Sequence, residues 1–155
     1  ILVNVDRLNA QSEAVSIIAK DSWIEGNDQH AIRVMLQAGV RGLVMFERIA
    51  VENVRYGGVF IKGKMDNKLD IVFRECVWRN VANKLDVSPI TIEPEGLGAC
   101  SIVFSDCLLV DDVDRPPVWV SQLCPNVRGT LRVKSPWTGT TIANAPGLTI
   151  ERVNA

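Results

Sequence analysis

The sequence predicts an all-β solenoid, in which one chain winds into stacked parallel coils with three short strands in each. Two observations predict it. One apolar pattern recurs along the chain, and each copy is followed by a short stretch in which apolar and polar residues alternate. A coil stacked on its neighbour must place like residues in register, whereas a helix bundle or a flat sheet needs no such recurrence.

Three copies of the pattern align without a gap. They are Val44–Val51, Ile71–Trp78 and Ile102–Leu109. Their third positions are Phe46, Phe73 and Phe104, which lie 27 and then 31 residues apart (46 to 73, 73 to 104). Because loops leave a stack sideways without disturbing it, unequal spacing is compatible with equal coils. We therefore expect the three phenylalanines to stack in the interior.

A weaker copy, Leu131–Thr138, places Val133 in line with Phe104. With this copy the predicted interior columns are Phe46, Phe73, Phe104 and Val133; Ile49, Cys76, Cys107 and Pro136; and Val51, Trp78, Leu109 and Thr138. Cys76 and Cys107 would be column neighbours within disulfide reach, but apolar surroundings favour free buried thiols.

The alternating stretches predict the last strand of each coil. They are Val59–Ile61, Ile90–Ile92, Val118–Val120 and Leu148–Ile150. Alternation with period two is typical of a strand with one buried face. Their middle residues should therefore point outward in one line, which consists of Phe60, Thr91, Trp119 and Thr149.

The beginning of the chain allows an opening copy and thus about five coils. Its apolar residues have nearly the spacing of the copy from 44 to 61, and they are Val3, Val5, Leu8, Ala10, Val15 and Ile17. Residues 18–42 would then be an insertion or an irregular coil, with Ala31–Leu36 as another possible strand; the two alternatives stay open. We expect one domain over residues 1–155, as part of a longer polypeptide, because the first residues already form a strand and lack an initiator Met.

Composition excludes several classes of function. The 17 basic and 18 acidic side chains are interspersed and give a net charge of −1, so neither nucleic acid nor a membrane surface is an expected partner. No apolar run reaches the roughly 18 residues of a membrane helix. The four cysteines form no CxxC pair and His30 is the only histidine, so we expect no zinc and no cofactor other than the Ca²⁺ considered below.

The form Ile-x-Phe-x-x-Cys-x-Trp at 71–78 resembles the right-handed parallel β-helix superfamily, typified by pectate lyases, polygalacturonases and phage tailspikes. The resemblance covers residues 43–150 and concerns the fold. It implies right-handed coils, which the general preference for right-handed crossovers also favours. It further implies an extracellular or surface-associated location, and either carbohydrate activity or service as an inert shaft.

Two outward columns are apolar where a monomer should be polar. They are Met45, Val72 and Val103, and Ala50, Val77 and Leu108, with Trp137 below the second. Apolar outer stripes mark surfaces that something covers. We expect an interface here with another domain of the parent polypeptide or with a second subunit.

The outward line of the last strands is the expected ligand face. Phe60 and Trp119 offer aromatic faces on which sugar rings can stack, and Lys62, Glu93 and Arg115 border the same surface. In similar β-helix enzymes the substrate groove runs along one sheet. A poly- or oligosaccharide is therefore the expected ligand.

Asp111, Asp112 and Asp114 precede the strand of Trp119 and are the candidate catalytic residues, as general acid and base or as ligands of a weakly expected Ca²⁺. Polygalacturonase-like hydrolases carry Asn-Thr-Asp, Asp-Asp, Gly-His-Gly and Arg-Ile-Lys elements, of which only Asp111-Asp112 is matched. His30 lies in a polar, turn-like run and is expected at the surface.

Two functions follow from these features. The first is a carbohydrate-facing β-helix module, as part of a polysaccharide lyase or hydrolase or as a glycan-binding segment. The alternative is a structural shaft or assembly unit, such as a segment of a spike or fibre, with no catalytic activity. Whether the chain is an enzyme stays open.

Overall fold

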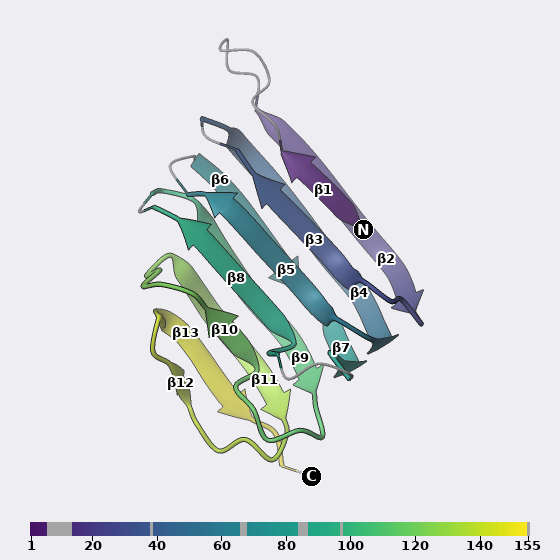
Figure 1. Ribbon diagram of the computed structural model, residues 1–155. Coiled ribbons are helices and arrows are strands. Elements are labelled where there is room, and N and C mark those ends of the chain that lie inside the picture. Colours follow the sequence, from purple (N-terminus) through teal and green to yellow (C-terminus); the bar gives the residue numbers. More distant parts are fainter. Residues whose placement is uncertain (6–13, 38, 66–67, 84–86, 97, 155) are drawn as a thin grey trace.

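The protein is a β-solenoid of about four turns (Figure 1). This computed structural model describes residues 1–5, 14–37, 39–65, 68–83, 87–96 and 98–154. Every regular element within these ranges is a strand, and the coils stack through parallel pairing. The predicted all-β solenoid is therefore confirmed, with about four turns where the sequence suggested about five.

The strands form two sheets that run along the stack, and Figure 1 shows them as two rows, one behind the other. The small sheet has the order β1-β3-β5-β8-β10, with bounds Leu2–Val5, His30–Leu36, Gly57–Lys64, Ile90–Glu95 and Val118–Val120. The large sheet has the order β12-β13-β11-β9-β6-β4-β2, with bounds Thr141–Ile142, Ala145–Arg152, Val127–Lys134, Ser101–Val110, Lys68–Arg74, Arg41–Val54 and Val15–Glu25. β7, Val77–Val81, pairs with β4 and β9.

Four successive coils turn a corner within the large sheet at a residue with positive φ. The corner residues are Asp21, Arg48, Glu75 and Asp106, with φ between 51° and 54°. Non-glycine residues rarely adopt this conformation, so its recurrence at one place in successive coils marks a built feature. In β2, β4 and β9 the strand continues through the corner, whereas Glu75 separates β6 from β7. The predicted corner is thus present in these four coils, whereas β11 has a register shift at this place.

The central column of phenylalanines forms as predicted. Phe46 pairs with Phe73 and Phe73 with Phe104, at ring-centroid separations of 5.1 and 5.2 Å and interplanar angles of 13° and 10°. All three rings are fully buried. Val51, Trp78 and Leu109 also share one register position, and the four cysteines are buried free thiols. These interior positions are the ones that the three gap-free copies identified.

The predicted C-terminal register is wrong. Gly129, not Val133, lies opposite Phe104, and Val133 lies opposite Leu109. Leu131 lies opposite Cys107 in the place predicted for Pro136, and Pro136 and Thr138 are exposed. The reason is local: Gly129 has φ 103°, and a Cβ there would lie 2.0 Å from the carbonyl oxygen of Phe104. Only glycine fits at position 129. Because glycine has no side chain, the apolar pattern of the sequence does not identify this position as an interior one.

The predicted opening copy is also wrong. β2 pairs with β4, which places Ile17 opposite Val44, while β1 pairs with β3, which places Val3 opposite Val34. Val3 and Ile17 therefore belong to different sheets. Val5 ends β1, Val15 begins β2, and Leu8 and Ala10 lie outside the described residues.

Residues 18–42 are part of the solenoid and not an insertion, because they carry most of β2 and all of β3. The alternative with a strand at 31–36 is the one that the structure shows. Ala19 and Ser22 stand opposite Phe46 and Ile49, so β2 has small side chains where its neighbour β4 has large ones. Because these side chains are small, the apolar pattern of the repeat cannot be recognised in this part of the sequence.

The small sheet ends at β10, which corrects the position of Thr149. Leu148–Ile150 is part of β13 in the large sheet, where Thr149 lies opposite Thr130. The two-residue β12 pairs antiparallel with β13, and Asn144 Nδ2 donates to the carbonyl oxygen of Val120 at 2.8 Å. The described part of the chain contains no helix long and apolar enough to cross a lipid bilayer.

Candidate functional site

The outward line on the small sheet is present for three of its four predicted members. Phe60, Thr91 and Trp119 follow one another in register on β5, β8 and β10. Their neighbours on each strand are buried, so the period-two alternation turns these three side chains outward. Trp119 is 47% exposed and Phe60 is half-buried. The exposed indole is the main apolar feature of this face.

Phe60 is covered on one side by its neighbours in the preceding coil. The ring of His30 lies 4.8 Å from the Phe60 ring centre, and the guanidinium carbon of Arg33 lies 5.6 Å from it. Burial lowers the pKa of His30, and the charge of Arg33 lowers it further against the opposing effect of Glu93. The imidazole packs on Phe60, and His30 stays partly exposed, in keeping with the expected surface position.

A hollow of about 360 Å³ adjoins Trp119 on the side of the preceding coil. Its lining combines apolar and polar groups, and the residues are Val87, Ser88, Thr91, Glu93 and Trp119. Lys62 lies opposite Glu93 in register, and its Nζ is 3.1 Å from Glu93 Oε2. The structure thus brings together Trp119, Glu93 and Lys62, three of the five predicted ligand-binding residues.

A second hollow, of about 200 Å³, adjoins Trp119 on the side of the C-terminal end. Its lining is mostly apolar and consists of Pro116, Val118, Trp119, Val120, Trp137, Thr141, Ile142, Ala143 and Asn144. The sequence placed Trp137 below Leu108 on the large sheet, but Arg132 takes that place. The segment from 135 to 144 has no apolar period, so no sequence signal pointed to Trp137 as a site residue.

Arg115 does not lie on this face. Its Nε is 2.8 Å from Asp111 Oδ2, and Nη1 and Nη2 donate to the carbonyl oxygens of Ala82, Val87 and Val81 at 3.0, 2.8 and 3.0 Å. Arg115 is 7% exposed and Asp111 is 4% exposed. A buried ion pair of this kind holds the backbone at Val81, Ala82 and Val87 against the start of the loop that leads to β10.

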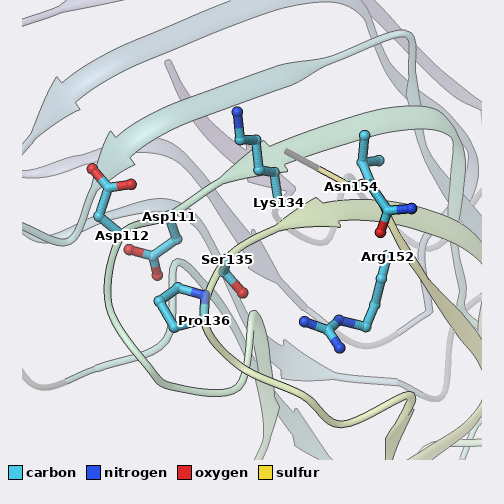
Figure 2. Close-up of a pocket in the computed structure, with 8 residues that line it drawn as sticks. Asp111, Asp112, Lys134, Ser135, Pro136, Arg152 and Asn154 are labelled. Atoms are coloured by element: carbon cyan, nitrogen blue, oxygen red, sulfur yellow. The ribbon is translucent and has the colours of Figure 1, made fainter.

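Asp111 and Asp112 also border a polar pocket of about 290 Å³ at the ends of β9, β11 and β13 (Figure 2). Figure 2 shows the carboxylates of Asp111 and Asp112 pointing in different directions, and the side chains of Lys134 and Arg152 pointing away from each other. Asp112 and Asp114 are exposed. The described residues contain no group of three or more His, Cys, Asp or Glu side chains that could hold a metal ion. A catalytic role for the three aspartates stays a prediction.

The predicted interface columns follow the register of the large sheet. Met45, Val72 and Val103 are paired in order, and Ala50, Val77 and Leu108 are paired in order. All six are partly exposed. The columns extend further than predicted, to Ile18 and Trp23 on β2, which are 50% and 66% exposed.

Comparison of the chain with protein-family models, with curated proteins and with solved structures finds no significant match.

Proposed function

We propose that this chain is a glycan-binding module of a parallel β-helix protein, and that a sugar ring stacks on Trp119. The observation that carries the proposal is the position of an exposed indole between two hollows on the outer face of the small sheet. An indole supplies a flat apolar surface for the axial C–H face of a sugar. Ser88, Thr91 and Glu93 supply hydroxyl and carboxylate groups for its hydroxyls.

The same geometry favours binding over hydrolysis. Glycoside hydrolysis uses two carboxyl groups on opposite sides of the scissile bond. Glu93 is the only carboxylate among the described lining residues of the two hollows, and it is paired with Lys62. Asp111 is occupied by Arg115. A module that holds a glycan needs no second free carboxylate.

The proposal includes right-handed coils of the pectate lyase-like kind and an extracellular or surface-associated location. The parallel register and the recurrent corner residues support membership of the parallel β-helix class. The handedness is supported by the general rule for parallel crossovers. The location follows from the resemblance, because chains of this type that handle polysaccharides work outside the cell.

A glycan array tests the proposal. Wild-type chain should bind a subset of glycans, and Trp119→Ala should lose that binding. The matched control is Trp23→Ala, which removes an indole that is also exposed but lies on the large sheet. Equal binding by wild type and Trp119→Ala, or the same loss in both variants, would contradict a site at Trp119.

The second candidate function is structural assembly, as in a segment of a spike or fibre. The apolar columns on the large sheet favour it, because Ile18 and Trp23 expose large apolar side chains in line with six partly exposed residues of the following coils. Sedimentation velocity separates this candidate from the first. If assembly is the function, wild type associates with rising concentration, Val77→Lys does not, and the glycan array stays blank.

A further inference from the structure

We infer that the ligand is an uncharged oligosaccharide chain that crosses Trp119 along the stacking direction and reaches Trp137 as its second aromatic contact. The inference rests on the proposed function and defines its ligand class. It also assigns a role to Trp137, which the apolar pattern had placed on the large sheet.

The first step is that Trp119 lines both hollows. One hollow is bordered by Thr91, which precedes Trp119 in the outward line of the small sheet. The other is bordered by Trp137 and by Thr141 and Ile142 of β12, at the C-terminal end of the stack. A ligand that fills both hollows must therefore pass over Trp119. A chain of several sugar units meets this requirement, whereas one ring occupies one hollow.

The second step is the charge of the ligand track, by which we mean the two hollows and Trp119 between them. Among the described residues that line the two hollows, Glu93 alone carries a formal charge, and Lys62 neutralises it at 3.1 Å. Recognition of a carboxylate or sulfate relies on charge-assisted hydrogen bonds from Arg or Lys. Arg115, which lies four residues before Trp119 in the sequence, is buried in its pair with Asp111. The hydroxyl groups of a neutral sugar, in contrast, can form hydrogen bonds with the side chains of Ser88 and Thr141.

The third step is that Trp137 is held in place. It packs partly buried against the core, and Gly139 lies so close to the indole that a Cβ at 139 would be 2.2 Å from Trp137 Cζ2. The bond from Asn144 to the Val120 carbonyl ties the same segment to β10, the strand of Trp119. The two indoles are therefore fixed relative to each other, which is what a preorganised site requires.

Isothermal titration tests the inference with defined probes. The probes are the disaccharides and tetrasaccharides of β-1,4-linked glucose, β-1,4-linked mannose and α-1,4-linked galacturonate. We expect a neutral tetrasaccharide to bind more tightly than its disaccharide and the galacturonates not to bind. Trp137→Ala should weaken the tetrasaccharide about three- to tenfold, as expected for the loss of one aromatic contact, and leave the disaccharide unchanged.

Controls separate this inference from the proposed function. Trp137→Phe keeps an aromatic ring in the same packing and should lose less affinity than Trp137→Ala, which rules out simple misfolding. If Trp119→Ala abolishes binding while Trp137→Ala has no effect on either length, the glycan site stands and the track is wrong. Tighter binding of the galacturonates overturns the uncharged ligand class. Absence of binding by every probe to wild type overturns the site and the track together.

Discussion

Arg115 joins parts of the chain that are distant in sequence. Its guanidinium group donates to the carboxylate of Asp111 and to three backbone carbonyl oxygens between residues 81 and 87. Both charged side chains are buried, so each depends on the other to offset the free-energy cost of its removal from water. The sequence suggested a ligand contact for Arg115 and catalysis for Asp111, and the contacts add a role in stability for the pair.

We predict that Arg115→Met lowers the free energy of unfolding by about 3–5 kcal/mol, because it leaves the carboxylate of Asp111 buried without a partner. Urea denaturation followed by circular dichroism measures the change. Lys62→Met is the matched control, since its ion pair with Glu93 is exposed and should contribute at most about 1 kcal/mol. Equal effects of the two substitutions would show that the Arg115 pair has no special structural role.

The buried thiols give the protein a sensitivity to alkaline pH. Burial raises the pKa of Cys100 from 9.0 to about 12, and burial also raises the pKa of Cys124. The folded chain therefore keeps a proton on Cys100 that the unfolded chain releases near pH 9. This contribution to stability is fully present below pH 9 and is lost as the pH rises toward 12.

We predict that the melting temperature falls between pH 9 and pH 12 and that Cys100→Ala reduces the slope of this fall, whatever it does to stability at pH 7. Differential scanning calorimetry over a pH series measures both slopes. Asp112→Asn is the control, since this side chain is exposed and lies apart from the buried thiols. A Cys100→Ala slope equal to that of wild type would contradict the assignment to Cys100.

At the scale of the element, strand spacing depends on a few glycines that face the neighbouring backbone. Gly63 in β5 lies opposite Leu36 in β3 and has φ 127°, and a Cβ at 63 would lie 2.2 Å from the Leu36 carbonyl oxygen. Backbone cannot yield as a flexible side chain can. The small sheet can therefore pair at this point only if residue 63 has no side chain.

We predict that Gly63→Ala destabilises the chain by more than the roughly 1–3 kcal/mol that a strained backbone conformation costs a non-glycine residue. Gly96→Ala isolates the clash, because Gly96 also has positive φ, at 82°, but a Cβ there meets nothing within 4 Å. Chemical denaturation of both variants gives the comparison. Similar losses would mean that the β3–β5 pairing shifts to make room.

The elements that the sequence predicted well are those with large apolar side chains in every copy. Phe46, Phe73 and Phe104 mark the central coils, and their register was predicted without error. The flanking coils were misplaced because each has a small residue where the central coils have a phenylalanine. In β2, Ala19 faces Phe46 and the apolar signal fades, while in β11 the place of the phenylalanine is taken by Gly129, which the close approach of the Phe104 carbonyl requires.

The site was predictable where it lies on regular strands. Period-two alternation placed Trp119 in line with Thr91, and the same register brought Lys62 beside Glu93. Trp137 was misplaced because its position depends on a segment without period, which is held by single contacts such as the one from Asn144 to Val120. Contacts of this kind are set by the tertiary structure and leave no pattern in the sequence.

At the scale of the whole molecule, each coil is stabilised mainly by the coils directly above and below it. The stability of such a stack is close to a sum over coils and their interfaces, so the centre and the ends respond differently to damage. Phe73 lies between two stacked rings, whereas Ile150 belongs to β13, which pairs with β11 and the short β12. Both side chains are buried.

We predict that Phe73→Asp abolishes amide protection over at least β4, β6 and β9, because a buried unpaired carboxylate in the central column breaks the contacts on both sides. Ile150→Asp should remove protection from β12 and β13 and leave β4 to β6 protected. Hydrogen exchange measured by mass spectrometry resolves the strands. If Ile150→Asp unfolded the whole chain as one unit, the coils would form a single cooperative body, and the nearest-neighbour description of the stack would be wrong.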